Sequence, residues 1–215
     1  FELGQWDQCA RAADEYLAES ASLGPHYLDS SVLAARCRLR LARDDVQAAL
    51  EDQAELLISA RQAKDPQMLH PALAISAYIL AAAGRAGEGR RILTQLFTAD
   101  VSNLFETFTD CMLAAEMLGL RDEARRWLGT ARHSAWSAVA LALADQEFAR
   151  AAESLDSMGA ARSAALARLH AAQQLVKAGR TADAEDQLRR ALDFFRSVGA
   201  TRFIREAQAL PAESA

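Results

Sequence analysis

Three arginines recur along one side of a helix that the sequence predicts near the start of the chain. Arg36, Arg40 and Arg43 are spaced i, i+4 and i+7 within the helix expected over residues 26–43, so they share a face. If that face lines a groove, their guanidinium groups would hold a carboxylate or a phosphate through forked hydrogen bonds. If it faces solvent, they would pair with acidic neighbours, and this is the interpretation that we favour. Those neighbours are Asp44, Asp45 and Glu51.

Two aromatic side chains are the other candidates for contact with a partner. Tyr78 and Trp136 lie within helices expected over residues 67–83 and 134–144. Large rings of this kind anchor partners when they line a groove, and they fill the space between helices when they do not. Both interpretations are open for each ring, and packing between helices is the commoner role.

The sequence contains no pattern that would support catalysis or hold a metal. Its histidines lie outside any HExxH motif and its cysteines form no CxxC pair. The glycine-rich run at residues 84–89 lacks the GK[ST] of a phosphate-binding loop and follows a helix, not a strand. We therefore expect no catalytic residue, no metal and no cofactor, so the chain is predicted not to be an enzyme. The residues considered are His26, His70, His133, His170, Cys9, Cys37 and Cys111.

The composition favours a compact helical protein. Of the 215 residues 51% are hydrophobic, only 7% are aromatic and nearly a quarter are alanine, a mixture that suits close contact between helices. The net charge of −5 argues against direct nucleic-acid binding, which usually needs a basic face. No apolar run reaches the ~18 residues needed to span a membrane, and no signal peptide is visible. We expect a cytoplasmic protein without a membrane partner.

A short pattern returns along the whole chain and positions these residues. A helix ends, a tight turn follows at glycine or a substitute, and a small residue stands five positions later, early in the next helix. The turns begin at Gly4, Asp44, Gly84, Gly119, Gln146 and Gly179, so they lie 40, 40, 35, 27 and 33 residues apart. The small residues are Cys9, Ala49, Gly89, Ala124, Ala151 and Ala184. Such spacing is typical of helical hairpins that stack on one another.

The apolar residues between these turns recur with helical spacing, and no segment alternates with a period of two. Asp65 and Pro66 are a good start for one helix, and Pro71 either marks the true start of that helix or kinks it. The predicted helices are 5–22, 26–43, 45–63, 67–83, 86–98, 103–118, 121–132, 134–144, 147–158, 160–178, 181–196 and 201–210.

The glycine turn followed by a small residue, repeated at this spacing, resembles the tetratricopeptide repeat (TPR). The run from Asp193 to Ala207 is similar to the closing segment of bacterial adenylate/guanylate cyclases and related transcriptional regulators, in which a helical-repeat tail follows a STAND-type signalling ATPase. The resemblance implies an all-α fold, a right-handed α-solenoid of about five or six stacked antiparallel helix pairs. Residues 1–215 would form one array excised from a larger protein, with a truncated first repeat and a capping helix at 201–210.

The same resemblance implies a function. First helices line the concave face of TPR arrays, which makes Arg36, Arg40, Arg43, Tyr78 and Trp136 the candidate groove residues. The expected role is a non-catalytic, regulatory protein-interaction module of a bacterial signal-transduction protein. Its partner would be a peptide, a protein, or the upstream ATPase, cyclase or DNA-binding output domain of the same chain. The alternative is a sensor domain that binds a small effector inside the superhelix.

Overall fold

The computed structural model describes residues 1–100 and 104–210, and within them it contains twelve helices and no strand. The all-helical prediction is thus confirmed; residue 103, the predicted start of one helix, lies outside the described residues. The helices are α1 Trp6–Leu23, α2 Asp29–Ala42, α3 Val46–Ala63, α4 Pro66–Ala82, α5 Ala86–Leu96, α6 Thr107–Leu118, α7 Arg121–Leu128, α8 Ala135–Ala144, α9 Phe148–Ser157, α10 Ala161–Lys177, α11 Thr181–Val198 and α12 Thr201–Gln208.

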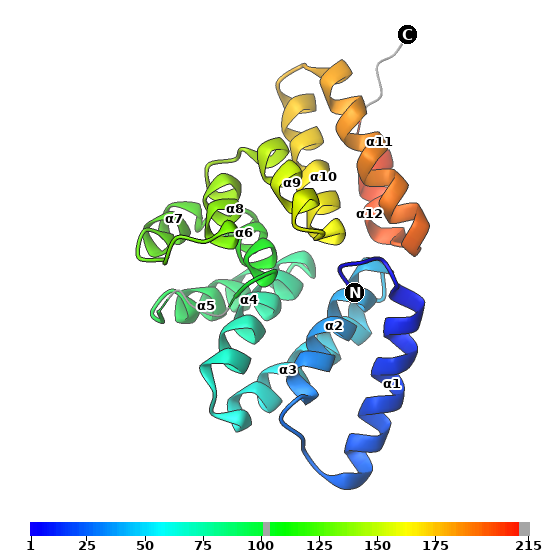
Figure 1. The fold of residues 1–215 in the computed structure, drawn as a ribbon, viewed down its shortest axis with the longest axis vertical. Helices are drawn as coiled ribbons and strands as arrows, with labels where there is room; N and C mark the ends of the chain where they lie inside the picture. The colour runs from blue at the N-terminus through cyan, green and yellow to red at the C-terminus, as the bar shows by residue number, and fades with distance from the viewer. Residues whose placement is uncertain (101–103, 211–215) are drawn as a thin grey trace.

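Two sets of helices build the molecule. The even-numbered helices α2, α4, α6 and α8 pack on one another in succession, and each odd-numbered helix packs against the even-numbered helices beside it in the chain. Odd-numbered helices such as α1, α5, α7 and α11 lie toward the outside (Figure 1). The inner helices are consequently buried on several sides, and α4, α6 and α10 each bury ten residues.

The turns between paired helices explain why the chain reverses where it does. Gly84 and Gly119 have φ of +78° and +66°, a region that costs an L residue with a side chain roughly 1–2 kcal/mol. Asp44 and Gln146, which replace glycine in two copies, have φ of +68° and +60°. Side chains hold both: Asp44 binds Arg205, and Gln146 Nε2 donates to Glu116 Oε1 at 3.0 Å. All four residues therefore perform the same turn.

The small residues that follow the turns sit where two helices nearly touch. Ala49 and Ala151 have no exposed surface. A β-carbon added to Gly89 would lie 3.3 Å from the Ala77 carbonyl oxygen and 3.3 Å from a methyl group of Leu118. Larger side chains there would push α5 away from α4 and α6.

The structure shows where two of the predicted helices begin. The helix predicted from residue 26 begins at Asp29, whose carboxylate accepts from the His26 backbone N–H at 2.8 Å and from the Ser20 hydroxyl at 2.7 Å. The preceding residues are thereby held in a turn. Helix α4 begins at Pro66, and the Asp65 carboxylate accepts a hydrogen bond from the Gln67 backbone N–H at 2.8 Å. Pro71 lies inside this helix and does not start it.

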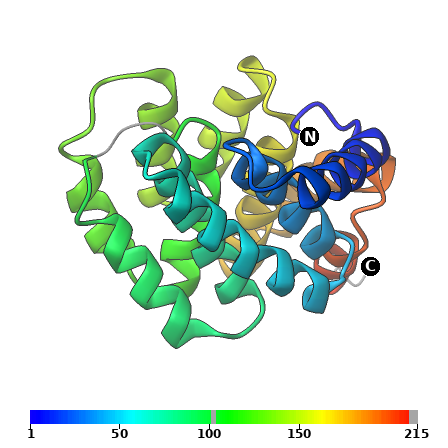
Figure 2. The same ribbon diagram turned by 90° about the horizontal axis from the view of Figure 1, so that it is seen from below.

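The chain winds around until its two ends meet (Figures 1 and 2). Helix α12 contacts α2, and Arg202 Nη2 donates to the Ala82 carbonyl oxygen at 2.8 Å. Between α1 and α11, the Trp6 and Phe194 rings are in edge contact, with centroids 6.0 Å apart. Helices from the beginning and the end of the chain are therefore in contact. No helix within residues 1–100 and 104–210 combines the length and apolar character that crossing a membrane requires.

Candidate functional site

The arginine row lies between α1, α2 and α3, where each guanidinium binds a carboxylate. Arg36 Nη2 lies 2.7 Å from Asp52 Oδ1 and its Nη1 2.8 Å from Asp14 Oδ1. Arg40 also pairs with Asp52 at 3.0 Å, and Arg43 pairs with Asp7. The acidic partners are thus Asp7, Asp14 and Asp52, and the pairing expected with Asp44, Asp45 and Glu51 was wrong. The proposal that this row meets a partner remains a prediction.

The two predicted aromatic residues have different surroundings. Tyr78 is buried in α4 with 4% of its surface exposed, and burial raises the pKa of its hydroxyl well above the ordinary value. Trp136 at the start of α8 is half-buried and borders an open pocket together with Phe105 and Phe108. Of the five predicted groove residues, Trp136 is the one that borders this pocket.

An ion-pair network, here called the inner cluster, joins three inner helices and the N-terminal segment. It consists of Glu2, Arg38, Asp110 and Arg162. Arg162 Nη2 lies 2.5 Å from Asp110 Oδ1, and Arg38 Nη1 lies 3.1 Å from Asp110 Oδ2. Glu2 Oε1 lies 3.5 Å from Arg162 Nη1. Asp110 has no exposed surface, so it is a buried carboxylate with two cationic partners.

The first two residues of the chain complete this centre. The Phe1 ring lies 4.8 Å from the Arg38 guanidinium carbon and 5.2 Å from that of Arg162, distances at which cation–π attraction acts. The Glu2 carboxylate accepts from the Ser163 backbone N–H at 3.2 Å, in the first turn of α10, where helices favour negative charge. The aromatic ring of Phe1 and the carboxylate of Glu2 thus both contact residues of the inner helices.

A pocket opens beside the inner cluster, and we call it the inner pocket. It has a volume of about 250 Å³ and lies between the starts of α2, α4 and α6. Its wall is mostly apolar, and the polar groups in it include Arg38, Ser30 and Thr107. Ser30 is 2% exposed, and its hydroxyl has no hydrogen-bond partner among the described residues. The apolar lining residues are Ala34, Leu56, Met68, Pro71, Ala72, Ile75, Leu104 and Phe105.

Phe105 separates the inner pocket from a second one, here called the outer pocket. The outer pocket has a volume of about 560 Å³ and includes Trp136 and Phe108 in its wall. Phe105 borders both pockets, is 57% exposed, and has φ of +41°. An aromatic residue rarely adopts positive φ, and strained backbone of this kind concentrates at binding sites. The sequence reasoning did not find this residue.

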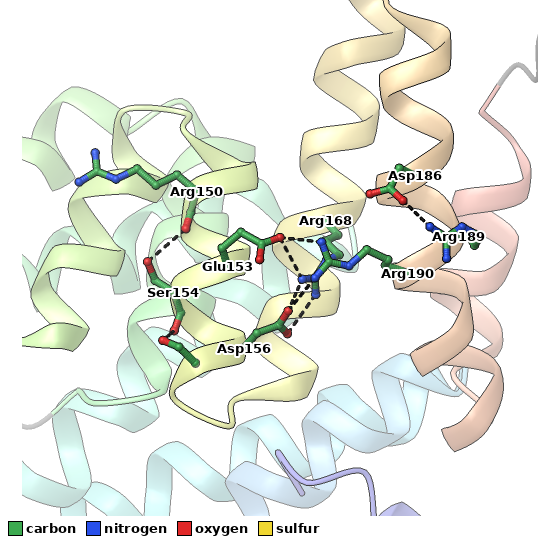
Figure 3. Close-up of polar contacts among 9 residues, drawn as sticks. Arg150, Glu153, Ser154, Asp156, Arg168, Asp186, Arg189 and Arg190 are labelled. Atoms are coloured by element: carbon green, nitrogen blue, oxygen red, sulfur yellow. Dashed lines mark hydrogen bonds and ion pairs between the residues drawn. The ribbon is translucent and has the colours of Figure 1, made fainter.

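A further network of charges lies on α9, α10 and α11 (Figure 3). Arg168 Nη1 binds Asp156 Oδ1 at 3.1 Å, and Arg190 Nη1 binds Glu153 Oε1 at 2.6 Å. Arg190 Nη2 also lies 3.0 Å from Asp156 Oδ2. The hydrogen bonds that Asp156 accepts from Arg168 keep the pKa of the Asp156 carboxyl below its ordinary value. Two arginines thus meet two carboxylates, so this network connects the three helices.

Within residues 1–100 and 104–210, no group of three histidine, cysteine or acidic side chains is placed to hold a metal ion. The three cysteines are free, with Cys37 and Cys111 buried. Comparison of the chain with protein-family models, with curated proteins and with solved structures gave no match.

Proposed function

We propose that this chain is a non-catalytic interaction module built as a TPR-like, right-handed superhelix of five or six helix pairs. Six copies of the turn pattern and the succession of inner helices support this architecture. We further propose that it is the cytoplasmic, regulatory region of a bacterial signalling protein. Its partner would be a peptide or a segment of a neighbouring domain, such as the output or ATPase domain.

The observation that carries the binding role is the exposed ring of Phe105. It stands between two pockets, on a backbone with φ of +41°, and Trp136 lies in the wall of the outer pocket. Aromatic side chains at the centre of a depression are typical of residues that dominate binding energy. An apolar side chain of a peptide would contact Phe105 and enter the outer pocket, and the inner cluster would keep the helices that frame it fixed.

The test is a selection of peptides from a displayed random library on the wild-type chain, with the Phe105→Asn variant as the counter-selection. Asparagine tolerates positive φ, so this variant removes the ring without adding backbone strain. Selected peptides should bind the variant at least about tenfold more weakly. The control is Leu23→Ser, which changes a side chain that is 78% exposed at the end of α1 and should leave affinity unchanged. Equal binding to all three chains, or no enriched peptide, would contradict the proposal.

A further inference from the structure

The inner pocket has the size and the wall of a site for a small molecule. Its volume of about 250 Å³ is below the range of about 300–1,000 Å³ found for drug-sized ligands. Most of its wall is apolar, with a few polar groups, which is the usual composition of ligand sites. An occupant would therefore be small, with an apolar body and one polar group.

Ser30 indicates where that polar group would lie. Its hydroxyl is buried and has no partner among the described residues. Buried hydroxyls are nearly always hydrogen-bonded, because an unmet one loses the hydrogen bonds that it makes with water. Ser31 is the next residue in α2 and also lines the pocket, but it is exposed and its hydroxyl contacts the Met68 sulfur at 3.6 Å. Of these two serines, Ser30 is therefore the one whose hydroxyl has no hydrogen-bond partner among the described residues.

Arg38 supplies a second donor from the same helix. Its Nε donates to the Ala34 carbonyl oxygen at 2.9 Å and its Nη1 binds Asp110, and neither of these contacts uses Nη2. The bond to Ala34 places the guanidinium about one helical turn, roughly 6 Å, from Ser30 along the axis. Two donors at this separation match the two oxygens of one carboxylate, for which arginine is the preferred partner.

We propose that the inner pocket binds a small carboxylic acid, with its carboxylate between Ser30 and Arg38 and its apolar tail against Ala72, Ile75 and Met68. This site would make the chain a sensor of a small effector. The proposed contacts with the acid are made by Ser30, Arg38, Ala72, Ile75 and Met68, and Phe105 also borders this pocket. Two acidic side chains would oppose such a ligand. Glu106 is half-buried at the pocket wall, and Asp110 already pairs with Arg38.

The experiment is a titration of isotope-labelled protein with hexanoate and with 3-phenylpropionate, followed through the methyl signals of Ile75 and Met68. At least one of these acids should shift both signals in a saturable manner, and the corresponding primary amide should bind about tenfold more weakly. No shift with either acid, or equal binding of acid and amide, would overturn the proposal.

Three variants separate the site from general effects on folding. Ser30→Ala should weaken binding about five- to tenfold without lowering the melting temperature, because it removes a hydroxyl that has no partner. Ser31→Ala is the matched control and should change neither property. Glu106→Gln should strengthen binding of the acid about two- to fivefold and leave the amide unaffected. Unchanged affinity in Ser30→Ala would overturn the inference, whereas weaker binding of the acid in Ser30→Ala with unchanged binding in Ser31→Ala would support it.

Discussion

Asp110 on α6 and Arg162 on α10 form an ion pair in which both side chains are almost completely withdrawn from solvent. Arg162 Nη2 lies 2.5 Å from Asp110 Oδ1, and the exposed fractions of the two side chains are 2% and 0%. Arg38 on α2 approaches the same carboxylate. One acidic residue thereby ties together helices from the beginning, the middle and the end of the chain.

Asp110→Asn should destabilise the protein strongly. The substitution removes the negative charge that compensates Arg38 and Arg162, and breaking a buried ion pair from one side typically costs about 3–5 kcal/mol. Urea denaturation of the variant and the wild type measures this loss as a lower free energy of unfolding. Asp186→Asn is the control, since Asp186 pairs with Arg189 at the surface and such pairs contribute about 0–1 kcal/mol. Similar losses in the two variants would mean that the inner cluster contributes little.

The turns could be predicted from the sequence because their chemistry is local. Asp44 and Gln146 were assigned as substitutes for glycine, and both have the positive φ that the turn needs. The helices followed from the same local pattern, but several of their ends differ from the prediction. The helix expected from residue 26 begins at Asp29, whose side chain holds the preceding turn, and the helix expected to end at residue 132 ends at Leu128.

The candidate site could not be predicted in the same way, because its residues are far apart in the chain. Asp110 lies 72 positions after Arg38 and 52 before Arg162. A signal was nevertheless present, since Asp110 is the lone charge between apolar neighbours from Phe108 to Ala115. For Arg36, the helical spacing predicted correctly that it shares a face of its helix with Arg40 and Arg43. The partner, Asp52, depends on how α2 and α3 are rotated against each other.

Ala49→Leu should destabilise the protein far more than Ala54→Leu in the same helix. Ala49 has no exposed surface, whereas Ala54 faces solvent. Extra methyl groups at a close helix contact cost about 1–3 kcal/mol, while a change at an exposed position usually stays within about 0.5 kcal/mol. Melting temperatures of the two variants, measured under the same conditions, test this difference. Equal shifts in melting temperature for the two variants would show that Ala49 does not lie at a close contact between helices.

The three cysteines should differ sharply in their reaction with a thiol reagent at pH 8. Burial raises the pKa of the Cys37 thiol to about 12 and moves that of Cys111 further up, so neither forms the reactive thiolate in the folded protein. Cys9 is only half-buried and should react first. Absorbance after addition of Ellman's reagent should show one fast equivalent, and two more only after denaturant is added. Three fast equivalents in the native protein would contradict the packing of α2 and α6.

Acidification should destabilise the protein through His170 before the carboxyl groups of Asp44 and Asp156 take up protons. Burial, together with the positive charge of Lys177, lowers the pKa of His170 to about 4, compared with about 6.5 in an unfolded chain. Above pH 6.5 the imidazole is neutral in both states. As the pH falls below 6.5, the unfolded chain takes up a proton that the folded chain excludes until about pH 4, so the free energy of unfolding falls. The expected loss through this residue is about 1–2 kcal/mol between pH 7 and pH 5.

The variant His170→Gln should lose most of this pH dependence, because glutamine does not titrate. His133→Gln is the matched control, since His133 is exposed and its removal should leave the pH dependence as in the wild type. Urea denaturation at pH 7, 6 and 5 measures the three slopes. The carboxyl groups of Asp44 and Asp156, whose pKa values arginines hold below 3.8, lose their stabilising contribution only below about pH 4. The His170 ring lies against that of Phe148, with centroids 5.4 Å apart. A wild-type slope that persists in His170→Gln would show that another group takes up the proton.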